Sequence, residues 1–198
     1  MKNIVASTNQ IQPSSLISEQ EIRTALLESL KGWEDVGARV QEELRLERGL
    51  ARIDIAVIGK RLIGYEIKSD ADSFARFPNQ IHAYNRIFDE IHLVCGPRHI
   101  EAALTAIPSW WGLSVAQRNS DQTVRIDKIR TACSNQRQDS FSLASMLWKD
   151  EALAMVENNS AMLPKQPSSH DLWEHIANSF PLDTIKNNVS STLLRRAV

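Results

Sequence analysis

Near the start of the chain, apolar residues recur at a helical spacing. Ser18 followed by Glu21 is typical of a capping box that opens a helix. Gly32 and Gly37 break the pattern at its other end. The apolar residues between them recur close to every 3.6 positions, as Ile22, Ala25, Leu26, Leu30 and Trp33. We therefore predict a helix with one face packed on a core, preceded by a flexible lead over residues 1–17.

From residue 39 to residue 68 the period changes to two, which is typical of strands. This alternation predicts three strands, at about 39–47, 51–58 and 62–68. In the second strand Ile53, Ile55 and Val57 would share one face, while Arg52 and Asp54 would share the other. In the third strand Ile63, Tyr65 and Ile67 would face one side, and Glu66 and Lys68 the other.

The middle of the chain predicts an alternation of helices and strands. Pro78 is suited to the first turn of a second helix, where its missing N–H costs little. That helix would turn Ile81, Tyr84, Phe88 and Ile91 inward. Further elements are predicted as a strand at 91–95, a helical stretch near 98–107, and closing strands at 113–117 and 123–129.

The last third of the chain predicts helices at about 141–157, 169–179 and 182–195. Leu172, Trp173 and Ile176 would form the docking face of the second of these helices. The predicted fold class is an α/β (α+β) core, with a mixed sheet in the order α-β-β-β-α-β, followed by a helical C-terminal extension. We assign the core to residues 18–132 and the extension to residues 133–198, packed on or next to the core.

Composition limits the class of protein. The chain has 198 residues, which suffices for one well-cored domain, and 42% hydrophobic with 24% charged residues is ordinary for a folded protein. No apolar run approaches the roughly 18 residues of a membrane span, and the N-terminus lacks a signal-peptide pattern, so a cytoplasmic location is expected. Cys95 and Cys133 stand apart, which argues against a zinc site. A net charge of -1 does not exclude a local surface for nucleic acid.

The second and third strands bring charged residues together. If Gly59-Lys60-Arg61 forms the hairpin loop, the register pairs 58 with 62, 56 with 64, 54 with 66, and 52 with 68. Asp54 would then oppose Glu66 directly, with Cβ atoms about 5 Å apart, and like charges at that distance destabilise a sheet. A hard divalent cation such as Mg²⁺ would compensate for the repulsion.

Lys68 adds a cation on the same face of the third strand. There it would orient or deprotonate an attacking water and stabilise charge developing on a phosphorane-like transition state. Two carboxylates with an adjacent lysine are what hydrolysis of a phosphodiester needs. The alternative is a solvated surface hairpin, in which Arg52 and Lys68 neutralise Asp54 and Glu66 across the strands.

These residues resemble a known family. Asp54, followed after eleven residues by Glu66-Ile67-Lys68, resembles the signature of the PD-(D/E)XK nuclease superfamily, although Ile53 replaces the proline of that signature. The segments RIDIAVIG, GYEIKSDAD and LWKDEAL are similar to a group of small bacterial proteins within it. With the last segment, the resemblance covers most of the chain and implies a restriction-endonuclease-like core.

The resemblance also implies roles for other residues. Gln80 and Tyr84 resemble the QxxxY motif of RecB-like and Cas4-like members, which would place Gln80 near the metal and Tyr84 near the DNA or the packing around it. Arg52 and Arg76 are further candidates for contacts with nucleic acid. Asp54, Glu66 and the Ile67 carbonyl would bind the metal. A further acidic ligand is expected from earlier in the chain, with Glu43 as first choice and Glu28 as alternative.

The leading interpretation is therefore a Mg²⁺- or Mn²⁺-dependent nuclease, with DNA as the favoured partner. Asp54, Glu66, Lys68 and Gln80 would be its catalytic residues. Two alternatives stay open: a nuclease-like DNA-binding or regulatory subunit that is inactive alone, and a protein-interaction module that docks through its C-terminal helices. A homodimer or a larger nuclease complex is compatible with each of them, and no membrane partner is expected.

Overall fold

The computed structural model describes residues 16–33, 37–75, 77–157 and 163–196. Of the predicted N-terminal lead, residues 1–15 lie outside this description. Ile17 belongs to the folded core, because its side chain is buried and its N–H donates to the Asp70 carboxylate. The first helix, α1 (Glu19–Ser29), opens with the predicted capping box of Ser18 and Glu21.

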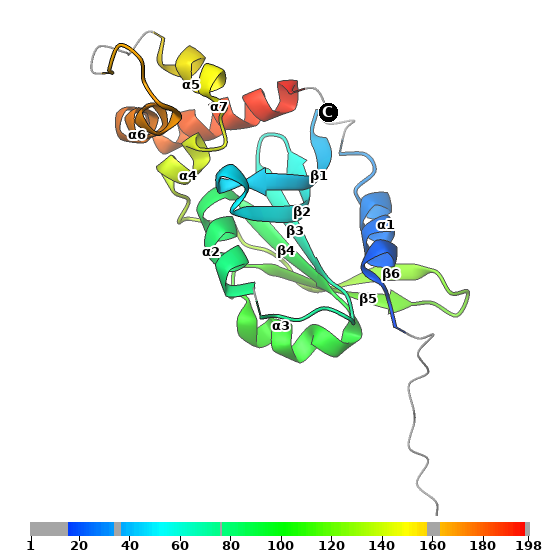
Figure 1. Ribbon diagram of the computed structural model, residues 1–198. Coiled ribbons are helices and arrows are strands. Elements are labelled where there is room, and N and C mark those ends of the chain that lie inside the picture. The colour runs from blue at the N-terminus through cyan, green and yellow to red at the C-terminus, as the bar shows by residue number, and fades with distance from the viewer. Residues whose placement is uncertain (1–15, 34–36, 76, 158–162, 197–198) are drawn as a thin grey trace, which may run out of the picture.

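A six-stranded sheet forms the centre of the molecule, with its strands neighbouring one another in chain order (Figure 1). The strands β3, β4 and β5 run parallel, and the other neighbours pair antiparallel. The strand bounds are β1 (Arg39–Leu46), β2 (Ala51–Ile58), β3 (Leu62–Lys68), β4 (Glu90–Cys95), β5 (Gly112–Arg118) and β6 (Val124–Arg130). Helix α2 (Phe77–Ile87) follows β3, so the predicted α-β-β-β-α-β order and the mixed sheet are confirmed.

Both faces of the sheet are covered (Figure 1). On one face α1 places Ile22 and Leu26 against Val57 and Ile67 in a smaller apolar cluster. The larger apolar cluster lies on the other face and includes residues of α2, α3 (Ile100–Ala106) and the C-terminal helices. Strands buried on both faces carry apolar residues at even and odd positions, as β2 does at Ile55, Ala56, Val57 and Ile58.

The alternation of faces breaks in β1 and β2 at one pair of acidic residues. Glu43 has a left-handed backbone with a φ of 56°, and neither Glu43 nor Asp54 belongs to the paired residues of the two strands. Beyond this point Leu44 and Ile53 belong to the larger cluster, whereas Ile55 belongs to the cluster under α1. The prediction that Ile53 shares a face with Ile55 and Val57 is therefore wrong, because the local distortion turns the next residues to the other side.

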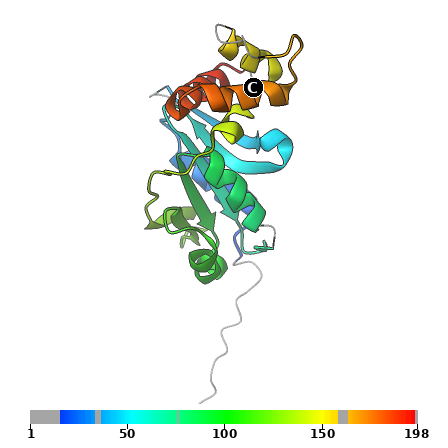
Figure 2. The same ribbon diagram turned by 90° about the vertical axis from the view of Figure 1, so that its left-hand side faces the viewer.

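The C-terminal extension is helical, as predicted, and packs on the larger cluster (Figure 2). Its helices are α4 (Ser140–Ala144), α5 (Lys149–Val156), α6 (Ser169–Ser179) and α7 (Leu182–Arg195). The predicted helix at 141–157 is two helices, because Trp148 has an extended backbone and its N–H donates to the Glu151 carboxylate, starting α5. The predicted docking face of Leu172, Trp173 and Ile176 is buried. No helix within the described ranges is long and apolar enough to cross a bilayer.

Candidate active site

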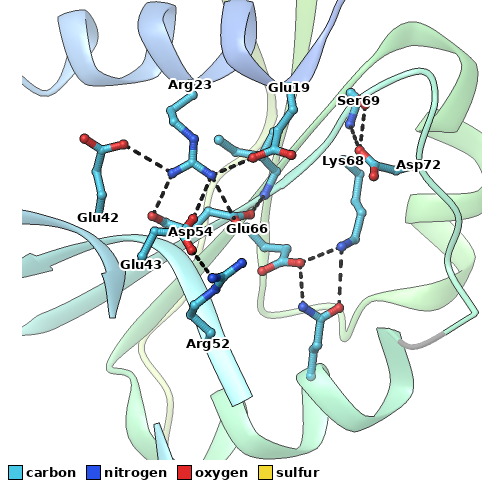
Figure 3. Close-up of polar contacts among 12 residues, drawn as sticks. Glu19, Arg23, Glu42, Glu43, Arg52, Asp54, Glu66, Lys68, Ser69 and Asp72 are labelled. Carbon is cyan, nitrogen blue, oxygen red and sulfur yellow. Dashed lines mark hydrogen bonds and ion pairs between the residues drawn. The ribbon is translucent and has the colours of Figure 1, made fainter. Parts of the chain in front are cut away.

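The four predicted catalytic residues line one open cavity of about 640 Å³. Asp54 comes from β2, and Glu66 and Lys68 come from β3 (Figure 3). Gln80 comes from α2. The cavity lies where β1 and β2 change faces, so the distortion at Asp54 positions its carboxylate beside the end of β3. The structure therefore brings together residues that are as far as 26 positions apart in the chain.

Glu66 is the centre of a polar network that we call the lysine cluster, consisting of Glu66, Lys68, Gln80 and Tyr84. The Lys68 ammonium donates to Glu66 Oε1 over 2.6 Å, and the Gln80 amide donates to the same oxygen over 2.9 Å. The Tyr84 hydroxyl lies 2.7 Å from Glu66 Oε2 and 2.6 Å from the Arg52 carbonyl oxygen. A hydroxyl has one hydrogen to donate, so these two acceptors compete for it.

The environment of Glu66 favours its protonated form. The residue is 1% exposed, and this burial raises the pKa of its carboxyl to about 7, with a further increase from the negative charge of Asp54. Lys68 and Tyr84 act in the opposite direction, because they donate hydrogen bonds to the carboxylate. Glu66 thus titrates close to neutral pH, which is where groups that take part in chemistry are commonly found.

Asp54 reaches β3 at a different point from the one predicted. The pairing of 58 with 62 and of 56 with 64 is confirmed, but the paired residues end at Ile55 and Tyr65. Asp54 and Glu66 therefore do not oppose each other in the ladder, and neither do residues 52 and 68. Instead, Asp54 Oδ2 accepts the Ile67 N–H over 2.7 Å. Burial raises the pKa of Asp54, against the effects of this hydrogen bond and of Arg23.

Arg23 on α1 forms a second polar network, which we call the arginine cluster. Its guanidinium contacts four carboxylates: Glu19 at 2.6 Å, Glu42 at 3.3 Å, Glu43 at 3.0 Å and Asp54 at 3.3 Å (Figure 3). It also donates to the Asp54 carbonyl oxygen over 3.2 Å. Although burial lowers the pKa of Arg23, these carboxylates raise it above its usual value.

Arg23 was not among the residues predicted from the sequence. An arginine next to Ile22 on an amphipathic helix is usually solvated, yet the Arg23 side chain is 9% exposed. The available signal was its spacing of four residues from Glu19, and that spacing is common on surface helices.

The expected third acidic ligand is not where the sequence suggested. Glu43 does not line the cavity; its carboxylate is bound by Arg23 and, at 2.6 Å, by Arg52. Glu28 does not line it either, since it is exposed and pairs with Lys31. Helix α1 does contribute an acidic residue to the cavity, and that residue is Glu19.

The candidates for nucleic-acid contacts divide into three cases. Tyr84 is fully buried and its hydroxyl contacts Glu66, so it lies in the packing around the site, which is one of the two places expected for it. The Arg52 side chain is 60% exposed and lines the cavity, so it is accessible to a ligand. Arg76 lies outside the described residues.

The residues of the cavity fit a hard divalent cation. Asp54 and Glu66 offer carboxylate oxygens, and the pKa of each is raised by burial, which a bound cation would offset. Ile67 lines the same cavity, and its N–H holds one Asp54 oxygen. Within the part of the chain that the structure describes, no group of three or more His, Cys, Asp or Glu side chains is arranged to hold a metal. Water and substrate oxygens would have to complete the coordination.

Comparison with known proteins shows the family of the chain. The family described as Bacteriophage P4 protein cII matches residues 12–197, which is almost the whole sequence. The chain belongs to the bacteriophage P4 cII family. Protein cII of Enterobacteria phage P4 is 26% identical to it over 185 residues, covering 92% of this chain and 69% of the phage protein.

A solved structure of a protein of unknown function from Silicibacter pomeroyi is also similar to this member of the P4 cII family. It has 21% identity and a TM-score of 0.43, and the similarity covers 64% of this chain and 76% of the other. Membership of the P4 cII family does not specify a reaction, so the chemistry has to be argued from the cavity itself.

Proposed function

We propose that this P4 cII family protein is a metal-dependent nuclease that hydrolyses phosphodiester bonds, with DNA as the favoured substrate. The observation that carries the proposal is the arrangement of Asp54, Glu66, Lys68 and Gln80 around one solvent-accessible cavity. This set is what the resemblance to the PD-(D/E)XK superfamily requires.

In this proposal Asp54 and Glu66 hold Mg²⁺ or Mn²⁺, aided by the Ile67 carbonyl. The bound cation would polarise the scissile phosphate and lower the pKa of an attacking water. Glu66 has to ionise before it can act as a ligand, and its pKa of about 7 makes this step accessible at neutral pH. The Ile67 N–H fixes the orientation of the Asp54 carboxylate, which lowers the cost of binding.

Lys68 and Gln80 have different tasks. The Lys68 side chain is 13% exposed and lines the cavity, so its ammonium can stabilise charge on a phosphoryl oxygen and orient the attacking water. Gln80 contacts both Glu66 and Lys68, the latter at 3.4 Å, and thereby fixes the positions of these two side chains relative to each other. Tyr84 stabilises the same arrangement through the hydrogen bond between its hydroxyl and Glu66 Oε2.

A second candidate is a nuclease-like subunit that binds DNA and is inactive alone. It is favoured by the absence of a third acidic side chain arranged for a metal within the described residues. In this case Glu66 would stay protonated or paired with Lys68, and a partner protein would supply any missing group. A protein-interaction module is the outcome that remains if neither nucleic acid nor metal binds.

The test is incubation of the purified protein with circular and linear, single- and double-stranded DNA, in Mg²⁺, Mn²⁺ or EDTA. Lys68→Ala is the site variant, and Lys60→Ala, in the exposed turn after β2, is the matched control. Cleavage that requires metal, persists in Lys60→Ala and disappears in Lys68→Ala supports the enzyme. Binding without cleavage in any metal supports the inactive subunit, and cleavage by Lys68→Ala at the wild-type rate contradicts the proposed mechanism.

A further inference from the structure

A groove of about 580 Å³ lies beside the proposed active-site cavity, between β1 and the C-terminal helices. Gly49, in the loop between β1 and β2, lines both the groove and the cavity, so the two spaces meet at this loop. Figure 2 shows the β1–β2 loop, in cyan, between the C-terminal helices and α2. The groove therefore adjoins the proposed site and is built largely by the extension.

The groove carries an excess of positive charge. Arg45, Arg48 and Lys149 line it, are exposed, and have no carboxylate partner among the residues described. The acidic residue in its lining is Glu43, and both of its oxygens are already bound by Arg23 and Arg52. The three unpaired cations therefore give the groove a local field that favours a polyanion, although the whole chain has a net charge of -1.

The loop between β1 and β2 is held in one conformation. Glu47, Arg48 and Gly49 have consecutive left-handed backbones, with φ values of 44°, 62° and 90°. The Glu47 carboxylate is bound by Ser142 at 3.0 Å and by Arg86 at 3.4 Å, which ties the loop to α4 and α2. Arg48 lies over the Trp173 ring at 5.6 Å from its centroid. The cation is therefore positioned in advance and loses little freedom when it binds an anion.

Exposed apolar side chains flank these cations. Trp148 lines the groove and is 65% exposed, with the Arg196 guanidinium 4.4 Å from its ring centroid. Leu50 is 86% exposed and lines the adjoining cavity. An exposed indole beside unpaired cations is the combination on which proteins stack unpaired bases while holding the phosphates. A duplex keeps its bases stacked inside, so it could not use the Trp148 ring in this way.

We propose that this groove binds a single-stranded segment of nucleic acid that leads into the active-site cavity. Arg45, Arg48 and Lys149 contact the phosphates, and Trp148 stacks with an unpaired base. The direction of the strand toward Asp54 and Glu66 rests on the proposed nuclease function, but binding in the groove does not. The C-terminal extension thereby selects for single-stranded DNA or for duplexes with single-stranded ends.

The experiment measures the affinity of the full chain for fluorescent oligonucleotides in EDTA, which prevents metal-dependent cleavage. Probes are a 20-nucleotide single strand, the matching duplex, and the duplex with a single-stranded tail. The groove variant combines Arg45→Gln, Arg48→Asn and Lys149→Gln, with Asn at 48 because it tolerates the left-handed backbone. The matched control combines Lys60→Gln, Arg98→Gln and Lys128→Gln, three exposed cations outside the groove.

The groove variant should bind the single strand more weakly, and the slope of log K against log salt should fall by about 2, since each lost phosphate contact accounts for about 0.7. Trp148→Ala should weaken single-strand binding about 5- to 150-fold and leave duplex binding unchanged. The control should bind as the wild type does. Thermal melting of each variant checks that the fold is intact.

The outcomes separate this proposal from the nuclease proposal. Loss of binding in the groove variant supports the groove even if the wild type never cleaves DNA. Equal loss in the groove variant and the control, or no binding of any oligonucleotide by the wild type, overturns it. Unchanged binding in the groove variant overturns it as well, even if cleavage still depends on Lys68.

Discussion

The arginine cluster and the lysine cluster lie side by side and share Asp54 as a neighbour, yet the buried groups at their centres have opposite charges. Arg23 is one buried cation among four carboxylates, and three of those are 38–50% exposed. Glu66 is one buried carboxylate, held by one ammonium and two neutral donors. The first arrangement neutralises a buried charge and joins α1 to β1 and β2. The second leaves an acid that titrates near neutral pH.

From this difference we infer that the arginine cluster stabilises the fold and that the lysine cluster serves the proposed reaction. The arginine cluster fixes the point at which β1 and β2 change faces, because Arg23 binds both the side chain and the carbonyl of Asp54. Three members of the lysine cluster, Glu66, Lys68 and Gln80, line the cavity, and under the proposed function they would exchange a proton or a protein contact for a metal ion. Substitutions should therefore separate the two, with stability as the main effect in one and activity in the other.

The largest effect on stability is expected for Arg23→Met. Removal of the cation takes a shared partner from four carboxylates, although Glu43 keeps Arg52 and Asp54 keeps the Ile67 N–H. Breaking a buried ion pair in this way costs about 3–5 kcal/mol. Because three of the acids are partly solvated, the lower end of that range is expected in urea denaturation. Lys31→Met is the control, since Lys31 is exposed and should change stability by less than about 1 kcal/mol. A loss below 1 kcal/mol in Arg23→Met would contradict the structural role.

The next largest effect concerns Glu66→Gln and pH. Since the folded-state pKa of Glu66 is raised to about 7 from an ordinary value of 4.5, the folded protein binds the extra proton between these values. The Glu66 carboxyl therefore lowers the free energy of unfolding as pH rises from about 4.5 to 7, and this loss of stability stays constant above pH 7. At pH 8, Glu66→Gln should be more stable than the wild type by about 3 kcal/mol, since each pKa unit corresponds to about 1.4 kcal/mol, while DNA cleavage is lost.

Denaturation at pH 4 and at pH 8 measures this effect. The stability advantage of the variant should be present at pH 8 and absent at pH 4. Glu42→Gln is the matched control, because the Glu42 side chain is 48% exposed and no comparable burial acts on it. An equal difference between variant and wild type at both pH values would show that Glu66 is ionised throughout.

Tyr84→Phe should have a smaller effect on stability. It leaves Glu66 Oε2 and the Arg52 carbonyl without their shared donor, which costs about 1–2 kcal/mol, while the ring keeps its place against Trp111. Cleavage should slow by about 10- to 100-fold, as is usual when a group that orients a metal ligand is removed. Tyr65→Phe, whose ring stacks on His92, provides the control. Normal cleavage by Tyr84→Phe would mean that Glu66 needs no positioning.

The smallest effect is expected for Arg52→Gln. The Arg52 side chain is 60% exposed, so loss of its pair with Glu43 should change stability by less than about 1 kcal/mol. Binding of DNA should still weaken, because Arg52 lines the cavity. A loss of several kcal/mol of stability in thermal or urea denaturation would show that Arg52 has a structural role, like the residues of the arginine cluster.

Much of this fold was accessible from local pattern. The capping box at Ser18, the strand bounds around Asp54 and Glu66, and the order of helices and strands along the chain follow from periodicity and turn residues, which act over a few positions. The interruption at Trp148 was missed, because the apolar spacing runs through it and the break depends on a local hydrogen bond to Glu151.

The site was only partly accessible. Asp54, Glu66, Lys68 and Gln80 were predicted to meet and do so. The change of faces at Glu43 was not predicted, because it needs a left-handed residue in one strand and the arginine of a distant helix beneath it. For the same reason the acidic residue that α1 contributes to the cavity is Glu19, and neither Glu43 nor Glu28 lines it. The direction in which a charged helical residue points is decided by tertiary contacts.

The most direct test of the central claim is anomalous diffraction from crystals of the protein grown with Mn²⁺ at pH 8, where Glu66 is ionised. We expect one strong peak between Asp54 and Glu66, about 2.1 Å from an oxygen of each carboxylate. A peak only elsewhere on the molecule, or no peak with Lys68 still bound to Glu66, would contradict a metal-dependent nuclease site.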